Sequence, residues 1–332
     1  MTLPRIGVFD SGVGGLTVLK AMAEQLPAHY LYFGDTARLP YGTKSAETVA
    51  RYAIGAARFL EAQNIDLLVI ACNTATALAF PLIQEAAHVP VVGVVEPGAA
   101  MAAEVSKSRS AIVIATEATV SSHAYRDALQ RHGLAAHEKA CPLFVPLVEE
   151  GWIEHPVTEQ VARIYLGEAL QQAPERADVL VLACTHYPLI APLLRRIAPE
   201  HMQIVDSAES TARVVKKIID WHPTLSPTAG DQGGAPAQEL ENPAVILSDS
   251  GNNQAARGRD ESANQSVILS EVRLPLAAAE RSRRTPIDAK IPPAEHRTFR
   301  FYVTDSTDKF KRLATRFLGR QVDNVEHVDL GG

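Results

Sequence analysis

Two cysteines in this 332-residue sequence stand at the ends of closely similar apolar runs. Residues 66–72 read DLLVIAC and residues 178–184 read DVLVLAC, and the two segments are identical at five of seven positions. Residues that can form hydrogen bonds follow each cysteine, namely Asn73, Thr74 and Thr76 in one copy and Thr185, His186 and Tyr187 in the other. A thiolate accepts a proton and a thiol donates one. Two such groups on opposite faces of a carbon acid could therefore invert it.

The predicted position of these thiols favours ionisation. A cysteine at the start of a helix ionises more easily than the ordinary thiol, whose pKa is about 8.5. Even an unshifted thiol loses its proton at pH 7 for about 2 kcal/mol, which is small beside the barrier of about 16 kcal/mol for a step at about 10 per second. The alternative is that two core cysteines end related strands through common ancestry. Cys141, which precedes Pro142 without a similar motif, is interpreted as structural.

The composition limits the classes of function. The chain is 46% hydrophobic and 21% charged, as expected of a soluble protein long enough for two domains. A net charge of −6 argues against nucleic-acid binding, and no apolar run approaches the ~18 residues of a membrane span. The first residues lead directly into a strand, so we expect no secretory signal. Three cysteines without metal-ligand spacing predict free thiols in a reducing cytoplasm and no metal site.

The elements that must position the cysteines alternate between strand and helix. Strands are predicted at 5–10, 30–35, 66–71, 89–95, 110–116, 142–148, 178–183, 203–206 and 299–305. Helices are predicted at 16–26, 45–63 with Ser45 as its cap, from the end of the strand at 66–71 to about 87, from about 121 to 132, near 156–172, and 306–319 between Ser306 or Thr307 and Gly319. This alternation predicts an α/β fold with mainly parallel sheets flanked by helices. Each cysteine would then lie at the carboxyl end of a strand, where such sheets bind ligands.

The same pattern predicts two α/β domains. The first is expected to span 1–96, with 207–222 and 298–332 completing it, and the second to span 97–206. Residues 223–297 are rich in Pro, Gly, Ser, Asn and Gln, which predicts a flexible, low-complexity insert. Two short apolar pieces in it, at 244–249 and 266–271, could form a hairpin or have no structural role.

Six motifs, in order, resemble the cofactor-independent glutamate racemases within the aspartate/glutamate racemase group. They are FDSGVGGL (9–16), DTARLPYG (35–42), ACNTAT (71–76), TEATVSSHAY (116–125), PLVEEGW (146–152) and ACTHYP (183–188). The closing FYVTDSTDKF also resembles the family's C-terminal segment, so the resemblance covers 1–222 and 298–330. It implies two pseudo-symmetric α/β domains with the active site in the cleft between them.

The resemblance also implies a reaction and a set of site residues. The reaction is the interconversion of L- and D-glutamate without metal or other cofactor, which supplies D-glutamate for peptidoglycan synthesis. The resemblance places Cys72 and Cys184 in the acid/base positions, with Asp10, His186 and a carboxylate of VEEG, for which we prefer Glu150 to Glu149, as helpers. The implied substrate contacts are Asp10, Ser11, Tyr41, Gly42, Asn73, Thr74, Thr116, Thr119, Thr185 and His186.

Three other functions stay open at this point. One is a racemase of aspartate or another amino acid, because side-chain length is read by pocket shape. Another is a non-catalytic amino-acid-binding protein, although binding alone needs none of Cys72, Cys184, Asp10 and His186. A thiol redox sensor would need the two cysteines within disulfide distance. Whether the chain forms a homodimer is also open, and no nucleic-acid or membrane partner is expected.

Overall fold

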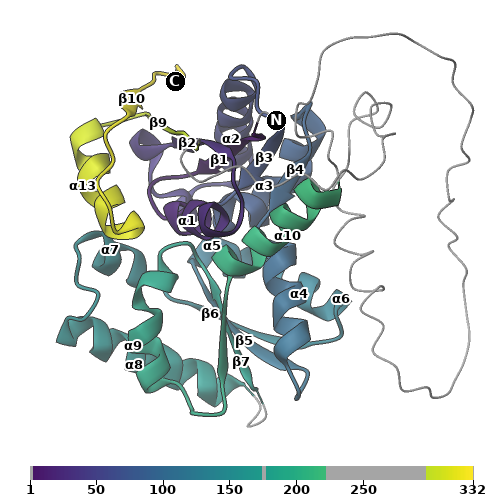
Figure 1. Ribbon diagram of the computed structural model, residues 1–332. Helices are drawn as coiled ribbons and strands as arrows, with labels where there is room; N and C mark the ends of the chain where they lie inside the picture. The colour runs from purple at the N-terminus through teal and green to yellow at the C-terminus, as the bar shows by residue number, and fades with distance from the viewer. Residues whose placement is uncertain (1–2, 174–176, 222–296, 332) are drawn as a thin grey trace, which may run out of the picture.

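Two parallel sheets form the framework of the molecule (Figure 1). The computed structural model describes residues 3–173, 177–221 and 297–331. The first sheet has the order β10-β9-β2-β1-β3-β4 and contains β1 (Arg5–Asp10), β2 (His29–Gly34), β3 (Leu67–Ile70), β4 (Val91–Gly93), β9 (Phe299–Val303) and β10 (Val325–His327). The second has the order β6-β5-β7-β8 and contains β5 (Ser110–Ala115), β6 (Ala135–Ala140), β7 (Val179–Ala183) and β8 (Gln203–Asp206). Each recorded pair of neighbouring strands is parallel, which confirms the predicted fold class.

The two sheets repeat one strand order. Strands β2-β1-β3-β4 of the first correspond in sequence order to β6-β5-β7-β8 of the second. This places β3, which precedes Cys72, and β7, which precedes Cys184, at matching positions. The strands β9 and β10 extend only the first sheet, where β9 pairs with β2. The molecule thus has two halves, each built around one sheet, and their predicted similarity is present in the order of the strands.

Helices cover both sheets. The longer ones are α1 (Leu16–Gln25), α2 (Ala46–Glu61), α3 (Asn73–Ala86), α4 (Val95–Val105), α8 (Pro156–Gln172), α10 (Ser207–Trp221) and α13 (Thr307–Leu318). The shorter ones are α5 (Glu117–Ser122), α6 (Ala124–Arg131), α7 (Phe144–Glu149) and α9 (Ala191–Ile197), with 3₁₀ turns η1 (Thr36–Arg38), η2 (Tyr41–Thr43) and η3 (Tyr187–Ile190). None of the helices within the described ranges is both long and apolar enough to cross a membrane.

The ends of α2 and α13 agree with the predicted caps. Ser45 Oγ accepts the backbone N–H of Thr48 at 3.3 Å, and Ser306 Oγ accepts that of Lys309 at 3.2 Å. Gly319 ends α13 at φ 70°, a left-handed conformation that favours glycine. Local hydrogen-bond chemistry therefore sets these boundaries, which explains why the sequence predicts them well.

The region 135–149 differs from the prediction. The predicted strand at 142–148 is wrong, because Phe144–Glu149 forms α7, and the strand is β6 at Ala135–Ala140. A short apolar run does not distinguish a buried helix from a strand by its periodicity. The predicted helix from about 121 to 132 is two helices, divided at His123, whose φ is 56°. Almost all of the predicted insert at 223–297, with its apolar pieces at 244–249 and 266–271, lies outside the described residues.

The core continues from one sheet to the other. One buried cluster joins Ile6 and Val8 of β1 to Ile112 and Ile114 of β5, through side chains of α1, α10 and α13. Helices α1 and α10 pack together between the sheets, as Figure 1 shows. Since both halves contribute to one packed cluster, their relative orientation is fixed by close packing. The strand ends that carry the cysteines are held by this shared core.

Candidate active site

Cys72 lies between β3 and α3, at the carboxyl end of the first sheet. All four residues of β3 are buried, and the extended backbone of Cys72 makes it the N-cap of α3. Its Sγ accepts the N–H of Ala75 at 3.4 Å and donates to Ser11 Oγ at 3.4 Å. The thiol is only 5% exposed. Ser11 follows β1 and Cys72 follows β3, so this hydrogen bond connects the carboxyl ends of two neighbouring parallel strands.

Asp10 ends β1 and is almost completely buried. Its Oδ2 accepts the N–H of Gly12 at 2.9 Å, whereas Oδ1 has no hydrogen-bond partner among the described residues. Burial raises the pKa of Asp10, and the charge of His186 and the backbone N–H groups of Gly15 and Gly12 oppose that rise. A Cβ at Gly15 would lie 2.6 Å from Asp10 Cβ, so this close packing requires glycine. The motif FDSGVGGL therefore packs a buried carboxyl group beside Cys72.

Cys72 is less acidic than its place at a helix start suggests. Burial, and secondly the Asp10 carboxylate, raise the pKa of Cys72 to about 12, although Ser11 and two backbone N–H groups oppose this. The expectation of easier ionisation is wrong for this thiol, because desolvation and a like charge outweigh the helix terminus. Ionising it at pH 7 would cost about 7 kcal/mol, which still lies below the barrier of about 16 kcal/mol for a step at about 10 per second.

Cys184 lies at the matching place after β7. Its Sγ is 3.9 Å from His186 Nδ1, and His186 Nε2 is 3.1 Å from Glu149 Oε1. Burial lowers the pKa of His186, but the hydrogen bonds to Cys184 and Glu149 raise it, with a net result of about 10. Burial raises the pKa of Glu149, but the hydrogen bond and charge of His186 and the charge of Lys309 lower it overall. Glu149, His186 and Cys184 thus form a line of hydrogen-bonding groups that ends at the Cys184 sulfur.

The carboxylate in this line is Glu149, not the preferred Glu150. Helix α7 ends at Glu149, and Glu150 follows as an exposed residue. Successive residues of a helix point about 100° apart, so only one of the two can face His186. The preference for Glu150 is corrected accordingly, because a sequence without the register of α7 gives no means of choosing.

The two halves meet between these two cysteine-bearing ends. Thr17 Oγ1 of α1 donates to the carbonyl of Thr185 at 3.1 Å. A Cβ on Gly14 would lie 2.2 Å from Thr185 Oγ1 and 2.5 Å from His186 Nδ1. The glycine loop after β1, which contacts Cys72 through Ser11, thus packs directly on the residues that follow Cys184. The charge of Asp10 also acts on both Cys72 and His186.

A second connection between the halves runs through Asn73. Its Oδ1 accepts the hydroxyl of Tyr125 at 2.6 Å, and its Nδ2 donates to Ser207 Oγ at 3.2 Å. All three residues are buried, and they come from α3, α6 and α10. Sequence reasoning assigned no role to Tyr125 or Ser207. The feature of the sequence that could have identified Ser207 is its position directly after β8, because Ser11 has the same position after β1.

The other predicted substrate contacts lie near the ends of β2 and β5. Thr74 Oγ1 is 3.0 Å from Thr116 Oγ1 and 3.3 Å from Thr119 Oγ1, and a Cβ on Gly42 would touch Thr116 at 3.4 Å. These hydroxyl groups form a cluster across the two halves, and one of them, Thr74, follows Cys72 by two residues.

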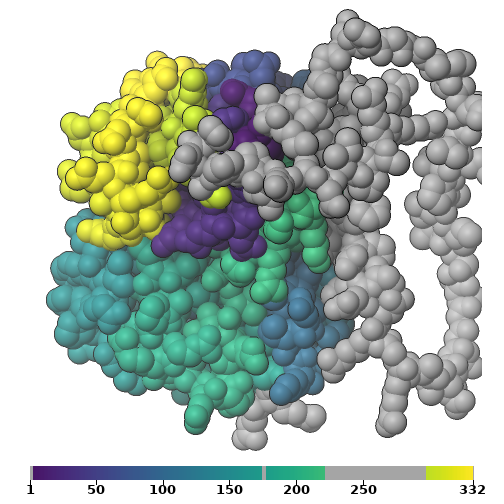
Figure 2. Space-filling view, viewed as in Figure 1, coloured from purple at the N-terminus to yellow at the C-terminus, as the bar shows by residue number. Residues whose placement is uncertain are grey.

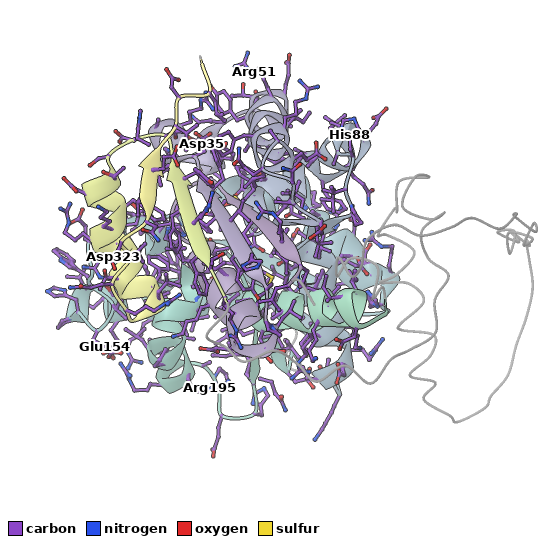
Figure 3. All side chains as sticks on the ribbon, turned by 45° about the horizontal axis from the view of Figure 1, so that its top comes forward. Asp35, Arg51, His88, Glu154, Arg195 and Asp323 are labelled. Carbon is purple, nitrogen blue, oxygen red and sulfur yellow. The ribbon has the colours of Figure 1, made fainter. Side chains whose placement is uncertain are left out.

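Tyr41 differs from this cluster, because its hydroxyl is already paired. It donates to Asp35 Oδ2 at 2.5 Å, while Asp35 Oδ1 accepts the hydroxyl of Thr304 at 2.8 Å. Figure 3 labels Asp35 near the returning C-terminal strands. The structure therefore gives Tyr41 a role in holding the loop that follows β2.

One cavity of the molecule is lined by neither thiol. That cavity, of about 570 Å³, lies among α3, β4, α4 and α6, and its lining by described residues includes Phe80 and Glu96 but neither Cys72 nor Cys184. Cys184, like Cys72, is 5% exposed. Within the described ranges, no group of three or more His, Cys, Asp or Glu side chains could hold a metal ion. Neighbouring side chains thus cover most of the surface of both cysteines in this structure.

Comparison with known proteins agrees with the motifs. The Asp/Glu/Hydantoin racemase family model matches residues 6–215. The glutamate racemase of Koribacter versatilis is 55% identical over 330 residues, which cover 99% of this chain and 98% of that protein. The crystal structure of a glutamate racemase isoform from Bacillus anthracis has a TM-score of 0.74 at 29% identity and covers 99% of both chains. The glutamate racemase of Francisella tularensis in complex with D-glutamate has a TM-score of 0.71 at 27% identity, again over 99% of both chains.

These matches confirm the resemblance that the six motifs indicate. The family model spans both cysteine-bearing strands, and the Koribacter protein matches almost the whole length. On these grounds the chain belongs to the Asp/Glu/Hydantoin racemase family.

Proposed function

We propose that the protein is a glutamate racemase that moves the α-proton of glutamate between two cysteines. Cys72 would serve one face of the α-carbon and Cys184 the other. The observation that carries the proposal is the pair of thiols at matching strand ends, each with its own polar partner and joined through the loop that contains Gly14. The choice of glutamate is supported by the curated relatives, which include glutamate racemases similar over nearly the full chain.

The groups beside the two thiols differ in charge. The pKa of His186 is raised to about 10 by its hydrogen bonds to Cys184 and Glu149, so an imidazolium lies beside the Cys184 sulfur at neutral pH. Cys72, with its pKa near 12 and a carboxyl group beside it, is a thiol at neutral pH. In one direction of the proposed reaction Cys184 accepts a proton and Cys72 donates one, and in the other direction the roles are exchanged.

The substrate itself would complete the charge balance. The ammonium group of an amino acid next to Asp10 would pair with the buried carboxylate, whose Oδ1 has no hydrogen-bond partner within the described part of the chain. A positive charge there would also make Cys72 easier to ionise, as the reverse reaction requires. The hydroxyl groups of Thr74, Thr116 and Thr119 are suited to a carboxylate of the substrate.

The proposal includes a cellular role. We propose that the product D-glutamate supplies peptidoglycan synthesis in the cytoplasm, as the resemblance to glutamate racemases implies. Within the described residues, Cys72, Cys141 and Cys184 are free cysteines. No metal or other cofactor is required by the proposed chemistry, because each proton transfer uses a side chain of the protein.

Racemisation in D₂O tests the proposal. L-glutamate and D-glutamate are incubated separately with the protein, circular dichroism follows chirality, and mass spectrometry follows α-deuterium. We expect each enantiomer to convert into the other, with solvent deuterium in the product and little in the substrate recovered early. Aspartate serves as the control substrate and should react much more slowly. Absence of racemisation would refute the function, and equal early labelling of substrate and product would refute a mechanism with two bases.

A further inference from the structure

The C-terminal helix α13 lies directly against the end of α7 that carries Glu149. In Figures 1 and 2 the yellow C-terminal residues cover this junction between the two halves. Arg316 Nη1 donates to the carbonyl of Val148 at 3.2 Å and to that of Glu149 at 2.6 Å. Both carbonyls belong to the last turn of α7; that of Val148 also accepts the backbone N–H of Gly151 at 3.0 Å, whereas that of Glu149 accepts its hydrogen bond from Arg316. Arg316 therefore fixes the backbone from which the Glu149 side chain extends.

The chain next to Glu149 leaves room for this arginine. Gly151 has φ 84°, and a Cβ there would lie 2.5 Å from Arg316 Nη2. A side chain at this position would displace the guanidinium group and strain the backbone. The contact of α13 with α7 thus depends on residues from both segments, although some 165 residues of sequence separate them.

Helix α13 also contacts His186, the residue with which Glu149 forms its hydrogen bond. The ring of Phe317 lies 5.5 Å from that of His186, edge to face at 89°, and Phe317 is buried. The charge of Lys309, two turns earlier on the same helix, acts on Glu149. Helix α13 therefore contacts the His186 ring through Phe317, holds the backbone of Glu149 through Arg316, and acts on the Glu149 carboxylate through the charge of Lys309.

We propose that α13 positions the acid/base group at Cys184, with Arg316 as its positioning residue. Arg316 holds the end of α7 so that Glu149 meets His186 Nε2, and Phe317 limits the tilt of the His186 ring toward the sulfur. This inference rests on the proposed racemase function, since the role is exerted through Cys184. The C-terminal segment is then part of the catalytic apparatus as well as of the first sheet.

Loss of Arg316 has a specific consequence for His186. The groups that face this imidazole are Cys184, Glu149 and the carboxyl group of Asp10. If Glu149 is displaced, one of the two hydrogen bonds that oppose burial is weakened, and the pKa of His186 falls from about 10. The imidazolium is then lost at a lower pH than in the wild type.

The test compares Arg316→Gln with Arg312→Gln. Arg312 is exposed one turn earlier on α13 and serves as the matched control. For Arg316→Gln we expect kcat to fall about 10- to 100-fold, as for a displaced catalytic group, with KM within about twofold. We also expect the NMR titration of the His186 ring, assigned by its absence in His186→Asn, to shift to lower pH. Arg312→Gln should match the wild type in both measurements.

The possible outcomes separate the proposals. Unchanged kcat and an unchanged His186 titration in Arg316→Gln would overturn the inference, as would an equal loss in Arg312→Gln. If Arg316→Gln does not fold, Arg316→Lys replaces it, and a smaller loss of kcat with a smaller titration shift is expected. Failure of the wild type to racemise glutamate would refute the proposed function instead, while the His186 titration would still test the positioning by Arg316.

Discussion

The ends of β3 and β7 carry nearly the same sequence into different surroundings. Cys72 caps the 14-residue helix α3 and lies beside a buried carboxyl group, whereas Cys184 precedes the four-residue turn η3 and lies beside an imidazole. The strand repeat sets the place of each thiol, whereas residues outside the repeat set the charged group that lies beside it. The comparison teaches that a symmetric framework can place two thiols next to neighbours of opposite charge, which suits the transfer of a proton from one face of a carbon atom to the other.

The largest effect is expected when one of the two thiols is removed, because the proposed mechanism requires both. We expect Cys72→Ala and Cys184→Ala each to lower racemisation by about 10²- to 10⁴-fold, the usual contribution of general acid–base catalysis. Polarimetry measures the rate and circular dichroism the fold. Cys141→Ala is the control, because this buried thiol lies outside the two ends and should stay close to the wild-type rate. Rapid racemisation by either single variant of the pair would show that the two thiols are not both required.

Asp10→Asn tests the contribution of the buried carboxyl group beside Cys72. The folded protein holds Asp10 at a raised pKa, so it binds more protons there than the unfolded chain, and its stability falls as pH rises above about 4. The amide removes this penalty, and we expect the free energy of unfolding at pH 7 and the Tm to rise, while kcat/KM falls. Calorimetry and steady-state kinetics measure the two effects.

The matched control for Asp10→Asn is Asp35→Asn. Asp35 is also buried at a strand end of the first sheet, but its oxygens accept hydroxyl groups of Tyr41 and Thr304. This variant should lose stability. A loss of Tm in Asp10→Asn equal to that in Asp35→Asn would contradict the view that Asp10 is held at the expense of stability.

Tyr125→Phe should give a smaller effect on the Cys72 side. It leaves Asn73 Oδ1 without its donor, which costs about 1–3 kcal/mol of unfolding free energy for a buried acceptor. We expect kcat/KM for glutamate to fall about 2- to 10-fold because Asn73 is less well oriented. The equilibrium constant of racemisation is one, so the loss must be equal in both directions.

Tyr30→Phe provides the comparison for that variant. Tyr30 is equally buried and donates to the carbonyl of Leu26 at 2.8 Å, away from the cysteines. A similar loss of stability with unchanged kinetics is expected. If Tyr30→Phe lowers kcat/KM as much as Tyr125→Phe does, the effect at Tyr125 reflects general loosening of the fold.

The sequence predicts well the features that depend on local chemistry. The parallel strands follow from apolar runs buried on both faces, and the helix ends follow from Ser45, Ser306 and Gly319. The strand repeat correctly leads to two cysteines at matching places in the topology. In these cases the decisive interactions lie within a few residues of each other or recur along the chain.

Features set by distant contacts were not predictable in the same way. Whether 144–149 forms a helix, and whether Glu149 or Glu150 faces His186, depends on how α7 packs against α13 and η3. The pairing of Tyr125 with Asn73 joins two helices whose relation only the complete fold defines. The acidity of Cys72 was misjudged because burial and Asp10 act from outside its own helix.

The burial of the thiols has a practical consequence for chemical probes. An alkylating reagent can attack a sulfur only while neighbouring residues have moved aside, because each side chain is 5% exposed in the structure. The rate of modification therefore measures how often the site opens, multiplied by the intrinsic reactivity of the sulfur. If one movement uncovers both Cys72 and Cys184, it multiplies both rates of modification by the same factor. The ratio of the two rates then reports the difference in reactivity between the two sulfurs.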